Sequence, residues 1–191
     1  MVAEEAPGEI VSHSLPTDPP PEAVLKPALR LLSARARSIR ELRDRLLKKG
    51  LDPADVSYCI RWLEDRELLD DRAFARSFLR DRLRFSPRSP FLLQRELRDK
   101  GVASALAGEA VEAVLREEET SALDLAVRAA KSWVRKQSPA TKAELVGHRF
   151  SPGREKARRR LYGFLARRGF VGATAQHGLE AGEEEARRPR D

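Results

Sequence analysis

The chain has 191 residues, of which 41% are hydrophobic, 6% aromatic and 35% charged. This proportion of charge excludes one thick globular core and favours thin layers of amphipathic helices with solvated faces. The net charge of +7 arises from 29 arginines and 8 lysines against 30 acidic residues, so we expect an acidic partner: nucleic acid, an anionic membrane or an acidic protein. Arginine binds phosphates bidentately, but a GC-rich genome or a hot habitat would also raise its content.

The cysteine content and the N-terminal sequence indicate the cellular compartment in which the protein is expected. Cys59 is the single cysteine, so no disulfide forms within the chain, which suits a reducing cytosol. No apolar run approaches the length of a transmembrane helix. The N-terminus carries glutamates and prolines instead of the basic and then apolar segments of a secretion signal. We therefore expect a cytoplasmic protein with no membrane partner.

The N-terminal third of the chain contains a tail and a first helical bundle. Residues 1–22 carry five prolines and few large apolar groups, so they are predicted to be disordered. Helices are expected to begin near Pro27, which suits a first turn. The second helix opens on a capping box of Ser38 and Glu41, and a third follows the pair Asp52-Pro53.

A second bundle begins at the run Leu69-Asp70-Asp71, where an aspartate caps a helix. Phe74 and Phe78 are expected to face inward, while four arginines at four-residue steps line the outer face of the same helix. These arginines are Arg72, Arg76, Arg80 and Arg84. A turn rich in serine and proline leads into a helix that ends at Gly101, and a further helix follows.

The third bundle follows three consecutive glutamates, whose charge favours a helix N-terminus. A predicted loop with two prolines and a glycine lengthens it, and a basic helix is then expected from Arg154 to Arg168. Beyond Phe170 the helical pattern weakens, because Gly172 and Gly178 lower helix propensity. We predict a poorly formed last helix and a charged, disordered tail after it.

One spacing recurs in the three bundles: leucines lie eight and four residues before a glycine, a cation precedes the glycine, and an apolar residue follows it. The copies end at Gly50, Gly101 and Gly169, each predicted to take the left-handed conformation that closes a helix. Three copies and no strand pattern predict an all-α fold, three tandem three-helix, helix-turn-helix-like repeats in an elongated, curved solenoid. The predicted segments are a tail at 1–22, repeats at 23–67, 68–117 and 118–180, and a tail at 181–191.

Motifs that carry catalytic or metal chemistry are not found. The chain has no glycine-rich phosphate loop, nucleophile motif or separated carboxylate pair, so no enzymatic activity is expected. Its three histidines have no second ligand at metal spacing, so neither a metal nor a cofactor is expected. Cys59 lies on an apolar stripe and is interpreted as a core residue. Trp62 and Trp133 are interpreted as packing anchors.

Three sets of residues, in order, carry a resemblance to a known family. They are Arg37-Ser38, Glu41-Leu42 and Lys49-Gly50; then Leu69-Asp70-Asp71, Phe74-Ala75, Glu96-Leu97 and Lys100-Gly101; then the stretch from Phe164 to Phe170. From about Ala28 to Leu179 the chain resembles the RecX family, bacterial regulators of the RecA recombinase. The final helix and the proline-rich N-terminal extension depart from the family pattern.

The resemblance implies a role in homologous recombination, DNA repair and the SOS response. A member of this family would be a non-enzymatic protein that lodges in the groove of the RecA–DNA filament. There it would damp ATP hydrolysis, strand exchange and co-protease activity. We expect a monomer that also binds single- and double-stranded DNA weakly, without sequence specificity and in a salt-sensitive way.

The basic side chains expected to contact RecA or DNA occur in all three repeats. They are Arg37, Arg40, Arg72, Arg76, Arg80, Arg84, Arg88, Lys156, Arg158, Arg159 and Arg167. For the row that ends at Arg84, a solvated face paired with acids such as Asp81 is the alternative interpretation. The helix around Arg158 has few acids nearby in the sequence, which favours contact with a partner. Arg168 stands at a helix C-terminus, where a cation is stabilising in any case.

Two other functions remain open. Each bundle is similar to a helix-turn-helix, so the chain could be a DNA-binding module without recombinase contact. Against this, the glycine-capped helices bury their leucines, and no helix offers a set of polar side chains suited to base edges. A helical scaffold for another acidic protein is the third possibility.

Overall fold

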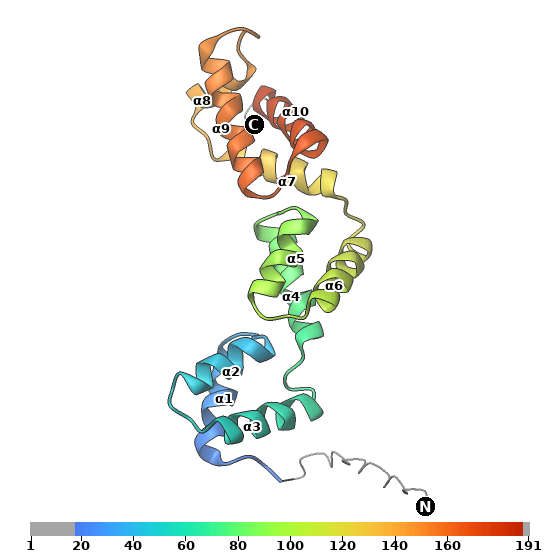
Figure 1. Ribbon diagram of the computed structural model, residues 1–191. Coiled ribbons are helices and arrows are strands. Elements are labelled where there is room, and N and C mark those ends of the chain that lie inside the picture. The colour runs from blue at the N-terminus through green and yellow to red at the C-terminus, as the bar shows by residue number, and fades with distance from the viewer. Residues whose placement is uncertain (1–17, 189–191) are drawn as a thin grey trace, which may run out of the picture. The chain divides into compact units, whose positions relative to one another are not determined.

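The structure, a computed structural model, describes residues 18–188, and within that range the chain forms ten α-helices and no strand (Figure 1). The all-α prediction is confirmed. The helices fall into two compact units, one ending at Asp70 and the other beginning at Asp71. Most of the predicted N-terminal tail, and the last three residues of the predicted C-terminal tail, lie outside the described residues.

The first unit is a bundle of α1 (Glu22–Ala34), α2 (Ile39–Leu47) and α3 (Pro53–Asp65). Its predicted caps form: Ser38 Oγ accepts a hydrogen bond from Glu41 N at 3.1 Å, and the Asp52 carboxylate accepts from the first turn of α3. Apolar side chains from all three helices make the core; they include Val24, Leu42, Leu46, Ile60 and Leu63. Cys59 is fully buried among them, and burial raises the pKa of its thiol to about 11, which confirms the core interpretation.

The start of α1 differs from the prediction. The helix begins at Glu22, so Pro27 lies inside it and not in its first turn. The N–H groups of Val24 and Leu25 donate to Pro21 O at 2.9 and 3.0 Å, so the first turn of the helix forms before Pro27. Proline lacks the N–H that would continue this ladder, but Val24 and Ala28 are both buried on either side of it. Their burial holds the earlier turn in place.

The second unit opens with α4 (Asp71–Phe85), α5 (Pro90–Asp99) and α6 (Ser104–Glu117). Phe74 is buried and its ring lies 6.1 Å from that of Phe78, which packs partly buried against the core, so both face inward as predicted. Ser89 caps α5 by accepting a hydrogen bond from Leu92 N at 3.2 Å. The turn between α4 and α5 is thereby held by its own serine.

Four more helices complete this unit: α7 (Ala122–Arg135), α8 (Pro139–Val146), α9 (Pro152–Arg167) and α10 (Gly172–Arg187). One continuous cluster of buried apolar side chains runs from α4 through α10, so the second and third bundles share a core. Helix α8 occupies the predicted loop. Ser138 Oγ caps it by accepting from Thr141 N at 3.3 Å, and Leu145 buries its apolar side.

The prediction of a weak last helix and a tail from residue 181 is wrong up to Arg187. Helix α10 is regular to that residue and lies against α7, α8 and α9. The glycines that lower its propensity allow close packing: a Cβ on Gly178 would lie 3.3 Å from Ala126 O, and one on Gly182 would lie 2.6 Å from Leu161 Cδ2. Tertiary packing therefore outweighs the local preference.

The three repeat glycines end their helices as predicted. Gly50, Gly101 and Gly169 have φ values of +78°, +93° and +80°, in the left-handed region. Gly169 also meets another bundle, because Ser89 N donates to the neighbouring Arg168 O at 2.9 Å. A Cβ on Gly169 would overlap Ser89 Oγ. The absence of a side chain at Gly169 therefore lets the start of α5 lie against the end of α9.

Candidate functional site

Four arginines follow one face of α4. Three of them form ion pairs with carboxylates of α6, a helix that the sequence does not place beside them. The pairs are Arg72 with Glu109 at 3.5 Å, Arg76 with Glu117 at 2.7 Å and Arg80 with Glu117 at 3.1 Å. These arginine side chains remain 41–63% exposed, and exposed pairs contribute only about 0–1 kcal/mol. An anionic partner would therefore replace the carboxylates at little cost.

The last arginine of this row is different. Arg84 forms no ion pair with any residue between 18 and 188, and its guanidinium lies 5.1 Å from the ring centre of Phe85. Phe85 ends α4 and is 71% exposed. A cation over an exposed aromatic ring gains about 0.5–1 kcal/mol, so the pair presents charge and an aromatic face together.

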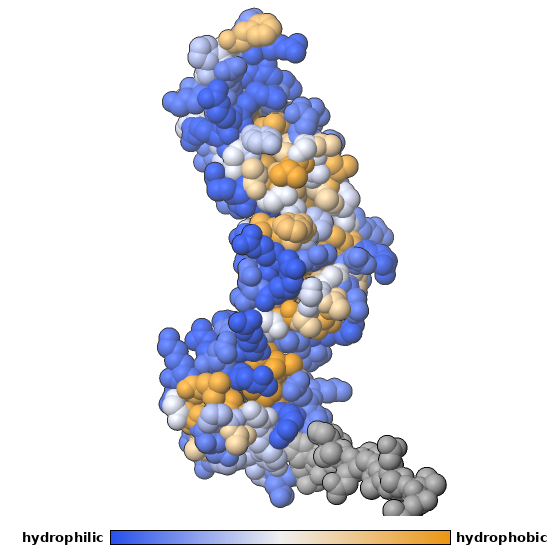
Figure 2. Space-filling view, viewed as in Figure 1, coloured by the Kyte–Doolittle hydropathy of each residue, from blue (hydrophilic) through white to orange (hydrophobic). Residues whose placement is uncertain are grey.

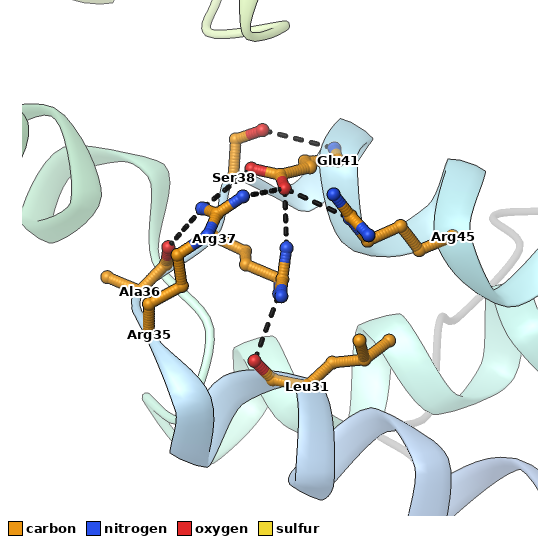
Figure 3. Close-up of polar contacts among 7 residues, drawn as sticks. All are labelled: Leu31, Arg35, Ala36, Arg37, Ser38, Glu41 and Arg45. Carbon is orange, nitrogen blue, oxygen red and sulfur yellow. Dashed lines mark hydrogen bonds and ion pairs between the residues drawn. The ribbon is translucent and has the colours of Figure 1, made fainter.

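Of the two arginines predicted in the first unit, Arg37 lies against the Glu41 carboxylate (Figure 3). Arg37 is only 7% exposed; its Nε donates to Leu31 O at 2.9 Å and its Nη1 to Glu41 at 2.5 Å. Arg35 and Arg45 also donate to this carboxylate. Arg37 therefore ties α1 to α2 and faces away from solvent. Arg40 is exposed and lies 3.8 Å from Asp44, so it remains accessible to a partner.

This cluster predicts a loss of stability in acid. Burial alone would raise the pKa of Glu41, but hydrogen bonds from Arg35 and Arg45 and the charge of Arg37 outweigh it and lower that pKa below 4.5. The Glu41 carboxylate is thus harder to protonate in the folded protein than in the unfolded chain. The stability that its ionised form contributes is complete above the unfolded pKa and is lost as pH falls through the folded pKa. Urea unfolding over a pH series measures this for wild type and Glu41→Gln. The free energies of unfolding of the two proteins should converge in acid. A difference between them that does not depend on pH would contradict the prediction.

The basic face of α9 is partly neutralised by α10, contrary to the expectation of few nearby acids. Glu183, 8% exposed, lies 3.0 Å from Arg154 and also pairs with Arg158. Arg159 pairs with Glu155 at 3.5 Å on its own helix. In the described part of the chain, Lys156 and Arg167 form no ion pair and are exposed. Hydrophilic residues cover much of the visible faces of α5 and α9 (Figure 2).

A small notch lies where the α4–α5 turn meets the C-terminal ends of α7 and α9. It has a volume of about 70 Å³ and is lined by Phe85, Pro87, Ala129, Ser132, Trp133, Lys136, Gln137, Phe164 and Arg168. The Arg168 guanidinium lies 4.0 Å from the ring centre of Phe164, and that ring lies 6.2 Å from the ring of Trp133. Trp133 thus packs against the core, as predicted, and also forms a wall of the notch.

The cations around this notch repel one another. Burial first, and then the charges of Arg88 and Arg167, lower the pKa of Arg168 below its ordinary value. Arg88 is itself paired with Glu96 at 2.6 Å, a carboxylate that also binds Arg82. The structure therefore brings two predicted residues, Arg88 and Arg167, to one place beside Arg168.

Sequence reasoning missed Phe85 and Lys136 as members of this notch, and assigned Arg168 only a helix-end role. These residues come from separate helices, so no local pattern joins them. Phe85 ends α4 next to Arg84 and is 71% exposed, which the structure alone shows.

The described residues contain neither a cluster of metal ligands nor a helix that could span a membrane. Within residues 18–188, no group of three or more His, Cys, Asp or Glu side chains is arranged to hold a metal ion. Over the same range, every helix is too short or too polar to cross a membrane. The basic surfaces of α4 and α9 and the notch remain the candidates for binding.

Comparison with known proteins identifies the family. Models of the first and second three-helix domains of RecX match residues 28–63 and 70–111. A crystal structure of RecX from Lactobacillus salivarius superimposes with a TM-score of 0.61 over 85% of this chain and 98% of that one, at 19% identity, which shows a shared fold.

Proteins named Regulatory protein RecX are similar along most of the chain. One from Corynebacterium efficiens is 36% identical over 148 residues, 77% of this chain and 65% of that protein. Others from Prosthecochloris aestuarii and Halorhodospira halophila are each 31% identical, over 82% and 87% of this chain and 91% and 92% of their own lengths. The chain belongs to the RecX family of regulatory proteins, which are not enzymes.

Proposed function

We propose that the chain binds the filament that the RecA recombinase forms on DNA and mainly inhibits its ATPase, strand exchange and co-protease activities. Membership of the RecX family is the observation that carries this proposal. The net charge of +7 supports it, since such a filament carries nucleic acid. On this proposal the protein acts in the cytoplasm, as a monomer.

The proposed contact surface is basic, and burial decides which predicted residues it includes. Arg37 is excluded because it is buried in the Glu41 cluster, and Arg158 because the Glu183 carboxylate holds it. Arg88 is set aside as well, because its side chain is 27% exposed and its partner Glu96 only 17%. The remaining side chains retain exposed charge or exchangeable surface pairs. They are Arg40, Arg72, Arg76, Arg80, Arg84, Lys156, Arg159 and Arg167.

The test is a titration of the protein into RecA, single-stranded DNA and ATP, with ATP hydrolysis as the readout. We expect hydrolysis to fall. No change in hydrolysis together with tight, sequence-specific duplex binding would instead support a helix-turn-helix DNA-binding protein. No change and no DNA binding would support a scaffold for an acidic protein. The buried leucines of α2 and α5 argue against base recognition by these helices.

A further inference from the structure

The notch at the end of α7 and α9 has unbalanced charge. Lys136 is exposed, and no ion pair joins it to another residue in the described range. Arg168 is held by stacking on Phe164, and its Nε is buried without a hydrogen-bond acceptor there. None of the described side chains that line the notch is acidic. The notch therefore attracts an anion and contains no group that repels one.

Its size and its aromatic rim restrict what the anion is. At about 70 Å³ the notch exceeds the ~10–15 Å³ of accessible volume that holds one water, so it has room for a small anionic group. Phe85 stands at the rim, 71% exposed, with the Arg84 cation over its ring. An exposed aromatic beside a cationic groove is the arrangement on which unpaired bases stack.

We infer that this notch binds a backbone phosphate of single-stranded nucleic acid between Lys136 and Arg168, while an adjacent base stacks on Phe85. The inference rests on the proposed function, because the filament supplies single-stranded DNA. A duplex keeps its bases stacked inside, so it would satisfy the cations and leave Phe85 unused. An acidic protein segment would do the same, and the experiment separates it from DNA.

The experiment measures binding of the full chain to two fluorescent oligonucleotides of equal length, oligo(dT) and an abasic strand, at several salt concentrations. Lys136→Gln tests the phosphate contact. Its matched control is Lys48→Gln, because both lysines are exposed C-caps of α-helices and neither forms an ion pair in the described range. Phe85→Ala tests stacking. Its control is Phe150→Ala, a phenylalanine 79% exposed beside the Arg149 cation.

Lys136→Gln should weaken binding of both strands and reduce the slope of log K against log salt by about 0.7, the contribution of one phosphate. Phe85→Ala should weaken oligo(dT) binding by about 5- to 150-fold and leave the abasic strand unchanged. Both controls should stay close to wild type. Arg168 is left intact because its stacking on Phe164 supports the fold.

The inference is overturned if either variant matches its control, or if both strands respond equally to Phe85→Ala. It is also overturned if the variants weaken binding to RecA without DNA and leave oligonucleotide affinity intact, which would indicate an acidic protein segment. A different result would contradict the proposed function itself. Wild type would then leave RecA hydrolysis unchanged, whatever the oligonucleotides show.

Discussion

Replacing Gly169 with alanine should lower the free energy of unfolding of the second unit by about 2–5 kcal/mol. Forcing a side chain into the left-handed region costs about 1–2 kcal/mol, and inserting a methyl group into a packed contact costs about 1–3 kcal/mol. Both apply here, because φ is +80° and the added Cβ would overlap Ser89 Oγ. Thermal or urea unfolding followed by helical circular dichroism measures the loss.

Ser89 has little freedom to move away. Its Oγ caps α5 through Leu92 N at 3.2 Å, and its own N–H donates to Arg168 O at 2.9 Å. The added Cβ would also lie 3.1 Å from Leu92 Cβ. The substitution therefore disturbs a helix cap and the joint between two bundles together.

Gly50→Ala is the matched control. Gly50 has nearly the same conformation, with φ at +78°, but no atom lies within 4 Å of a Cβ placed there. It should cost only the conformational term of about 1–2 kcal/mol, in the first unit. Equal losses for the two variants would show that the contact between α9 and α5 contributes nothing.

Replacing Glu183 with alanine should destabilise the second unit by about 3–5 kcal/mol, the usual result of leaving a buried charge without its partner. The carboxylate is 8% exposed and joins α10 to Arg154 and Arg158 of α9. The Arg154 side chain is itself only 16% exposed. Without Glu183 the largely buried Arg154 guanidinium would lose its carboxylate partner, so the contact between α9 and α10 would weaken.

The neighbouring residue provides the control. Glu184 pairs with Arg188 at 3.7 Å and its side chain is 64% exposed. Exposed pairs contribute about 0–1 kcal/mol, so Glu184→Ala should be nearly neutral by the same unfolding measurement. If Glu183→Ala is equally mild, the buried carboxylate does not hold α10 to α9.

Features determined by neighbouring residues were predicted well. Ser38, Asp52 and the glycines at 50, 101 and 169 act through atoms within a few positions along the chain, so their roles follow from spacing alone. The same local rule could have found α8, since Ser138-Pro139 repeats the cap pattern of Ser151-Pro152.

Features determined by distant residues were not predicted. Gly178 and Gly182 lower helix propensity locally, and only their approach to Ala126 and Leu161 explains why α10 forms. Arg76 finds its acid at Glu117, 41 residues away. The notch likewise depends on three helices meeting, so a sequence pattern on any one of them does not reveal it.

The most direct measurement of the central claim is RecA-catalysed ATP hydrolysis on single-stranded DNA as a function of added protein. A chain that acts on the filament should inhibit when it is present at well below one molecule per RecA subunit. Inhibition that appears only when the protein saturates the DNA would reflect competition for phosphates, and hydrolysis that never changes would contradict the proposed regulation outright.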